Sequence, residues 1–137
     1  MGISKDIGAI FRYLHRQRHQ YLEPLGLKSI HGRYLLAICK NPGISQDGLS
    51  QVLGFDKSNV ARQAAFLEEN GFLRRCPGQD KRMLCLHPTD KTLQLLPGLE
   101  EAMEQWEQQL LRGLSRQEIQ VLSGLLEKLR RAAEQEG

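Results

Sequence analysis

A cluster of hydrogen-bonding side chains lies within residues 57–63. These side chains carry ammonium, hydroxyl, amide and guanidinium groups, and they are Lys57, Ser58, Asn59, Arg62 and Gln63. Groups of this kind bond the edges of bases in a major groove and the oxygens of phosphates. The arginine is the best suited to a base, because its fork can bond guanine O6 and N7 together. The chemistry that this cluster favours is contact with double-stranded DNA.

The cluster lies on a predicted helix that begins at Asp56. A carboxylate at this place can accept backbone N–H groups of the first helical turn. The apolar residues are spaced by four and three, as one buried face requires, and they are Val60, Ala64 and Leu67. The polar cluster therefore occupies the opposite face, where the alternative interpretation is an ordinary solvated helix surface.

A shorter helix precedes this one, and a glycine separates the two. Ser45 is its expected N-cap, and Gly54 stands in the turn. Two helices joined by a short turn with a glycine are typical of a helix-turn-helix. Residues near the two helix starts suit phosphate contacts, because helix N-termini carry partial positive charge, and these residues are Ser45, Gln46 and Lys57.

A β-hairpin is predicted after the second helix. One strand is expected to start with residues 72–75, and residues 83–87 are expected to form its partner. The loop between them is rich in turn residues and charge. Its basic tip, Lys81 and Arg82, can reach a narrow minor groove, where negative potential favours arginine. The alternative is that Asp80 and Arg82 only stiffen the hairpin.

The sequence resembles the MarR family of winged helix-turn-helix regulators in three segments. These are LSQVLGFDKSNVARQAAFLEENGFLRR, DKR at residues 80–82 and HPTDK at residues 87–91. The family wing carries an Asp-x-Arg pattern, which Asp80 and Arg82 fill, with Arg82 facing DNA and Asp80 positioning it. The resemblance implies a sequence-specific transcriptional regulator, a homodimeric repressor that binds a pseudo-palindromic operator and is released by a small-molecule effector. Phe66 departs from the pattern, because the family usually has a basic or polar residue there.

Long helices are predicted at both ends of the chain, the first of them at residues 3–22. Each carries an apolar seam with spacings of three and four residues, formed by Ile3, Ile7, Ile10 and Leu14, by Leu96, Leu99, Met103, Trp106 and Leu110, and by Ile119, Leu122, Leu126, Leu129 and Ala133. Pro97 predicts a kink or a late start of the second seam helix. We expect the seams to join two chains; the alternative is packing within one chain.

The expected architecture is mainly α with a small β-hairpin, an α+β fold in which end helices flank a winged helix-turn-helix. Residues 1–137 form a single domain, with the DNA-binding module at 29–91 and dimerisation helices at 1–25 and 92–137. The resemblance also implies an effector pocket between the end helices and the module. A small aromatic or anionic compound would need aromatic surface and positive charge. The candidates that supply these are Arg12, His15, Arg16, Tyr34 and Trp106. For each of them, packing or dimer contact is an equal alternative.

Composition sets limits on other functions. The net charge is +3, which is only mildly basic, so a winged-helix protein-interaction module without sequence-specific DNA binding is the alternative hypothesis, and Phe66 supports it. No Gly-rich phosphate loop, paired carboxylates or nucleophile–base pair predicts an enzyme, and no cofactor is expected. No apolar run is long enough for a membrane span, and a small, odd number of cysteines fits a reducing cytoplasm.

Two side-chain pairs have a further possible chemistry. Cys76 and Cys85 fall on the two predicted strands and could face each other, so a redox role depends on their separation. His15 and His19 are four residues apart, a spacing that can place two imidazoles on one metal. Neighbouring arginines disfavour a cation there, so no metal site is predicted.

Overall fold

The computed structural model describes residues 1–79 and 83–136. The predicted wing tip, Asp80, Lys81 and Arg82, lies outside the described residues. The chain divides into two compact units, residues 1–103 and residues 104–137. None of the helices in the described part of the chain has the length and apolar character needed to cross a membrane.

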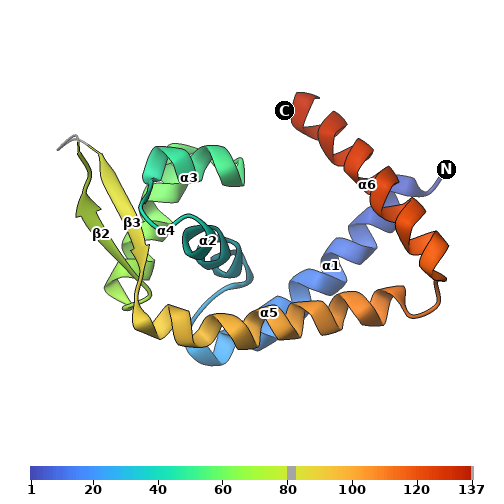
Figure 1. Ribbon diagram of the computed structural model, residues 1–137, viewed down its shortest axis with the longest axis horizontal. Coiled ribbons are helices and arrows are strands. Elements are labelled where there is room, and N and C mark those ends of the chain that lie inside the picture. The colour runs from blue at the N-terminus through green and yellow to red at the C-terminus, as the bar shows by residue number, and fades with distance from the viewer. Residues whose placement is uncertain (80–82, 137) are drawn as a thin grey trace. The chain divides into compact units, whose positions relative to one another are not determined.

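The first unit holds most of the elements. Along the chain these are α1 (Ile3–Leu22), the short 3₁₀ helix η1 (Glu23–Leu25), α2 (Ser29–Lys40), β1 (Ile44–Ser45), α3 (Gln46–Leu53), α4 (Lys57–Glu69), β2 (Leu73–Pro77), β3 (Leu84–Pro88) and the first part of α5 (Asp90–Leu111) (Figure 1). The predicted fold, mainly α with a β-hairpin and a winged helix-turn-helix, is confirmed. The helix at residues 3–22 begins and ends where the sequence predicted. A late start of α5 is wrong, because this helix begins at Asp90 and continues through Pro97.

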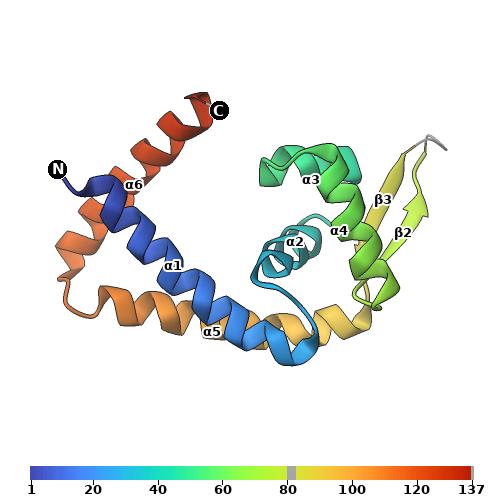
Figure 2. The ribbon, with the colours of Figure 1, turned by 180° about the vertical axis from the view of Figure 1, so that it is seen from behind.

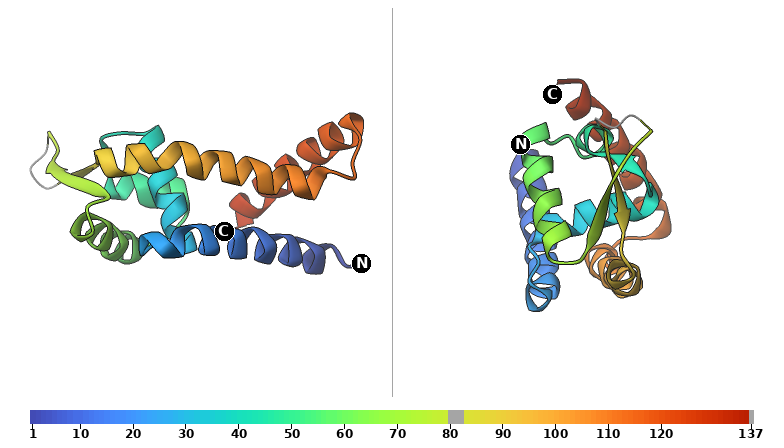
Figure 3. Two further views of the ribbon diagram at one scale, coloured as in Figure 1. Left: turned by 90° about the horizontal axis from the view of Figure 1, so that it is seen from below. Right: turned by 90° about the vertical axis from the view of Figure 1, so that its left-hand side faces the viewer.

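The small sheet has one strand more than the sequence predicted. Its strands are antiparallel and lie in the order β1-β3-β2, with Ile44 paired to Leu86. In the hairpin, Leu73 is paired to Pro88 and Cys76 to Cys85. Figure 3 shows this hairpin projecting from the unit beside α4.

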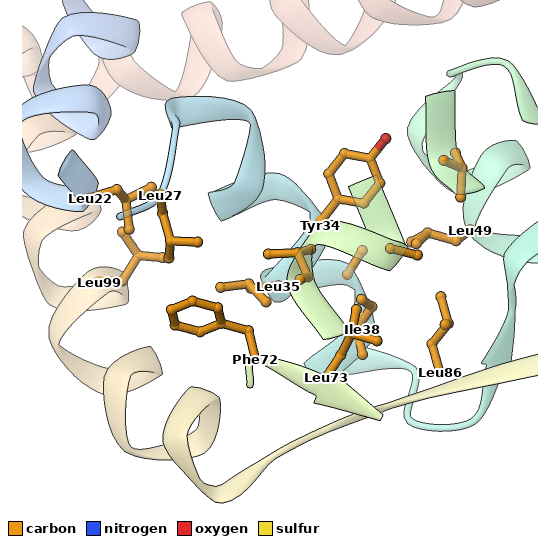
Figure 4. Packing of buried hydrophobic residues seen from close by; sticks show 14 residues of the cluster. Leu22, Leu27, Tyr34, Leu35, Ile38, Leu49, Phe72, Leu73, Leu86 and Leu99 are labelled. Carbon is orange, nitrogen blue, oxygen red and sulfur yellow. The ribbon is translucent and has the colours of Figure 1, made fainter. Parts of the chain in front are cut away.

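The hydrophobic core of the first unit is built around α2. This helix packs between the end of α1 and the α3–α4 pair (Figure 2). Its fully buried side chains are surrounded by leucines of α3, α4 and the sheet and by Phe72, which directly precedes β2. Leu22, Leu27 and Leu99 close one end (Figure 4). Gly32 permits this approach, because a Cβ there would lie 3.3 Å from Leu22 and 3.8 Å from Leu99. The core therefore fixes α3, α4 and the hairpin as one module.

The second unit consists of the end of α5 and helix α6 (Arg116–Glu136). Ser115 and Glu118 cap α6 reciprocally, since Glu118 N donates to Ser115 Oγ at 3.1 Å and Ser115 N donates to Glu118 Oε1 at 2.9 Å. A reciprocal capping box of this kind satisfies two backbone N–H groups at the start of a helix. Large apolar side chains remain exposed along α6, and they are Val121, Leu125, Leu126 and Leu129.

Candidate nucleic-acid interface

The start of α4 is fixed by Asp56, as the sequence predicted. Its carboxylate accepts a hydrogen bond from Asn59 N at 2.7 Å and another from the Ser58 hydroxyl at 2.9 Å. These bonds lower the pKa of Asp56, the bond from Asn59 most. Because the Ser58 hydroxyl donates its hydrogen to Asp56, the exposed Ser58 oxygen can only accept a further hydrogen bond. It therefore suits the amino group of a base.

Arg62 is the best placed of the predicted base contacts. It lies on the exposed face of α4, opposite the buried side chains of Val60, Ala64 and Leu67. Within residues 1–79 and 83–136 its guanidinium has no hydrogen-bond or ion-pair partner. All of its donors therefore remain available to a base edge or a phosphate.

The predicted phosphate contacts cluster near the N-terminus of α3. Ser45 Oγ accepts a bond from Gly48 N at 2.9 Å, which leaves its O–H proton to donate. Gln46 accepts from Arg75 Nη1 at 3.4 Å through its side-chain oxygen, so its amide nitrogen is the group left to donate. Lys57 lies 3.8 Å from Asp47, and both side chains are largely exposed. An exposed pair of this kind is weak, so a phosphate can displace the aspartate.

Gln63 and Asn59 are only half exposed, in contrast to Arg62. The side-chain oxygen of Gln63 is 2.8 Å from His31 Nε2, on α2. Asn59 Oδ1 is buried and has no hydrogen-bond partner among the described residues. Both side chains therefore lie at the edge of the exposed face of α4 rather than at its centre.

His31 and Phe66 form a contact that the sequence did not indicate. Their rings stack with centroids 4.8 Å apart and an interplanar angle of 10°. Phe66 thus packs against α2 and does not stand on the exposed face of α4. The N-cap of α2 is Lys28, and Ser29 is the first residue within the helix. No local pattern signals this stack, because His31 and Phe66 belong to different helices.

An ion pair ties the hairpin to α4 and was also missed by sequence. Arg75 Nη2 lies 2.8 Å from Glu68 Oε1, and the Arg75 backbone N donates to Glu68 Oε2 at 3.1 Å. The side-chain bond from Arg75 lowers the pKa of Glu68. Since Arg75 also reaches Gln46, one guanidinium links α3, α4 and β2. The hairpin is thereby held in a fixed position relative to the exposed face of α4.

The predicted effector residues lie in different surroundings. Arg12, His15 and Arg16 are exposed on α1, where His15 stacks on Phe11 with centroids 5.7 Å apart. Tyr34 is buried in the core and stacks on Phe55 at 5.8 Å, and burial raises its pKa. Trp106 is half-buried in the second unit. An effector site made of these residues stays a prediction.

Arg18 is a further basic residue of α1, and the sequence did not single it out. It is half-buried, and its Nε atom has no hydrogen-bond partner within the part of the chain that the structure describes. Burial lowers its pKa, and the charge of Arg33 lowers it further.

The cysteines are free thiols, and the described residues contain no cluster of side chains that could bind a metal ion. Cys76 and Cys85 are directly opposite each other on β2 and β3, as the sequence predicted, and both are half-buried. Across residues 1–79 and 83–136, no three His, Cys, Asp or Glu side chains are gathered closely enough to hold a metal ion.

Comparison with known proteins relates this arrangement to a family. A model of the MarR family matches residues 25–82. The chain is 31% identical to the HTH-type transcriptional regulator YybA of Bacillus subtilis (strain 168), over 98% of this chain and 90% of that protein. The crystal structure of the transcriptional regulator SlyA matches with a TM-score of 0.93 and 28% identity, over 99% of this chain and 96% of that one.

A further similar structure contains nucleic acid. It is a MarR family transcriptional regulator from Listeria monocytogenes complexed with a 26mer DNA. This structure matches with a TM-score of 0.86 and 31% identity, over 93% of this chain and 86% of that one.

Proposed function

The chain belongs to the MarR family of DNA-binding transcriptional regulators, which are not enzymes, and on that premise we propose that it is a homodimeric repressor of a pseudo-palindromic operator. The observation that carries the proposal is the exposed polar face of α4, where Arg62 has its donors available beside Ser58 and Lys57. In a dimer, two such helices enter successive major grooves about 34–36 Å apart. Residues 29–91 act as the reading module, and residues 1–25 and 92–137 join the two chains.

Each contact in this proposal has a defined role. Arg62 reads a base edge, Ser58, Asn59 and Gln63 support it, and Ser45, Gln46 and Lys57 hold phosphates. At the wing tip, Arg82 enters the minor groove, Asp80 positions it, and Lys81 adds charge.

The dimer accounts for apolar surface that each unit leaves exposed. On α1 the exposed side chains include Ile3, Ile7, Ile10 and Phe11, and α6 adds a second apolar surface. A shallow groove of about 510 Å³ in the second unit is lined by Leu114, Gln117, Glu118, Val121, Leu122 and Leu125. Large exposed apolar patches mark interaction sites in soluble proteins, and the family membership favours a second copy of this chain as the partner.

An anionic aromatic compound is the effector class that the basic residues of α1 and α2 favour. Burial lowers the pKa of Arg18, and the positive charge of Arg33, on α2, lowers it further. Further positive charge comes from the exposed face of α1, where Arg12, His15 and Arg16 lie. Effector binding shifts the dimer to a state whose two reading heads no longer match the operator, and the DNA is released.

The test is selection of operators from random-sequence duplex by the purified full chain, at two salt concentrations. A two-fold symmetric motif with half-sites one helical turn apart, bound with a steep salt dependence, is the expected result. Weak binding that is insensitive to salt and enriches no motif would overturn the proposal and favour a winged-helix protein-interaction module.

A further inference from the structure

The imidazole of His31 is held from three directions at the junction of α2 and α4. The side chain is 2% exposed. The Lys28 backbone N donates to its Nδ1 at 2.8 Å, its Nε2 lies 2.8 Å from Gln63 Oε1, and its ring stacks on Phe66. A buried ring with both nitrogens bonded has one orientation.

These contacts determine which nitrogen carries the proton. A backbone N–H can only donate, so Nδ1 must be an acceptor, and a neutral imidazole then carries its hydrogen on Nε2. Burial is the largest cause of a lowered His31 pKa, and the positive charge of Lys28 lowers it as well, while the bond to Gln63 raises it. From α4 the ring is faced by the uncharged side chains of Gln63 and Phe66. The ring is therefore neutral at neutral pH.

The proton on Nε2 in turn fixes the carboxamide of Gln63. An N–H group needs an acceptor opposite it, so the amide oxygen faces His31, and the amide nitrogen is the end that remains. A glutamine without such a constraint can turn its amide to present either a donor or an acceptor. Here the side chain presents two N–H donors at the edge of the exposed face of α4, next to Arg62.

We propose that His31 is a positioning residue for DNA reading, which holds Gln63 so that its amide nitrogen meets an acceptor on DNA. The acceptor is guanine O6 or N7, thymine O4 or a phosphate oxygen. His31 itself does not touch the DNA and acts through Gln63. This inference rests on the proposed role of α4 as the reading helix, and it adds the residue that sets the polarity of one of its contacts.

A mutant cycle on operator binding tests the coupling of the two residues. His31→Phe retains an aromatic ring to stack on Phe66 but removes both hydrogen bonds, and Gln63→Ala removes the contact to DNA. Each single variant is expected to weaken operator binding about three- to tenfold, the range of one hydrogen bond. In the Gln63→Ala background, His31→Phe should cause no further loss. Equal losses in both backgrounds would show that His31 only packs, and would overturn the inference.

The tautomer supplies a second readout that does not involve DNA. The ¹⁵N chemical shifts of the His31 imidazole should show the neutral Nε2–H form in the wild-type chain at neutral pH. In Gln63→Ala the Nε2 shift should change while Nδ1 still accepts from Lys28. An Nδ1–H form, a protonated ring, or a shift unaffected by Gln63→Ala would each contradict the inference, even if His31→Phe fails to fold.

The two readouts separate this inference from the proposed function. If the wild-type chain binds no duplex while the ¹⁵N shifts are as expected, the reading role of α4 is wrong and the bond between His31 and Gln63 stands. If the chain selects a symmetric operator but the shifts or the mutant cycle fail, the regulator proposal stands and the positioning role of His31 is wrong.

Discussion

Arg62 combines exposure with a guanidinium that has no hydrogen bond or ion pair within the described part of the chain. Arg62→Ala should weaken binding to the selected operator by about 1–3 kcal/mol and relax the preference at one base position. The measurement is fluorescence anisotropy titration against the operator and its single-base variants. Lys57→Ala is the matched control, because loss of a phosphate contact weakens all sequences alike and reduces the salt dependence. An Arg62→Ala variant that keeps the full sequence preference would remove this residue from the set of base contacts.

His31 also gives the fold a pH dependence whose direction follows from its burial. Its pKa lies below the ordinary value of 6.5, mainly because the ring is desolvated. The contribution of His31 to the free energy of unfolding is fully present above pH 6.5 and declines as the pH falls. The reason is that the unfolded chain binds a proton on this imidazole at a higher pH than the folded chain does. Below the folded-state pKa the decline ends. The free energy of unfolding, measured with urea between about pH 7.5 and pH 5, should therefore decrease as the pH falls. His31→Phe should reduce the slope of this free energy against pH. An equal slope in the variant would assign the effect to other groups.

The residue contacts that sequence predicted are those with partners nearby in the chain. Asp56 and Ser45 cap their helices as expected, because an N-cap bonds a backbone group three residues on. His31 and Gln63 are 32 positions apart, and nothing in the residues around either one indicates the other. The ion pair between Arg75 and Glu68 joins a strand to the preceding helix. The spacing of apolar residues does not predict this pair either.

At the scale of elements, the long periodic helices were predicted best. The seam of α1 and the polar face of α4 repeat over several turns, so their bounds follow from the pattern. Strand β1 was missed because it has two residues, and its pairing with β3 depends on the fold of the intervening chain. Of the two outcomes predicted from Pro97, the late start is wrong, since α5 continues through Pro97 despite the missing N–H, and the kink stays a prediction.

The register of the hairpin makes a prediction about its two cysteines. Gly78 N donates to Met83 O at 2.7 Å, so the pair two residues back, Cys76 and Cys85, is expected at a hydrogen-bonded position with Cα atoms about 5.5 Å apart. Oxidation with diamide should therefore link these two cysteines within one chain and leave Cys39, on α2, unlinked. Peptide mapping by mass spectrometry checks the linkage, with Cys76→Ser as the control. A disulfide that includes Cys39, or one between two chains, would contradict the register.

At the scale of the whole molecule, the exposed apolar side chains of α6 are the feature that a monomer leaves unexplained. Leu129 is 50% exposed, near the centre of the apolar face. Successive helical residues are about 100° apart, so Gln120 lies on the opposite face. Leu129→Glu should place a charge in the proposed dimer interface and give monomers at micromolar concentration, whereas Gln120→Glu, with the same charge, should leave a dimer. Sedimentation velocity measures the outcome.

The same two variants relate assembly to DNA binding. A monomer has one reading helix, so Leu129→Glu should bind a single half-site and a full operator with similar, weak affinity, while Gln120→Glu should retain the preference for the full operator. The melting temperature of the wild-type chain should also rise with protein concentration, because association stabilises the folded chain, and that dependence should disappear in Leu129→Glu. If Leu129→Glu remains dimeric and binds the full operator normally, the apolar face of α6 serves another partner, and the two chains must be joined through α1 instead.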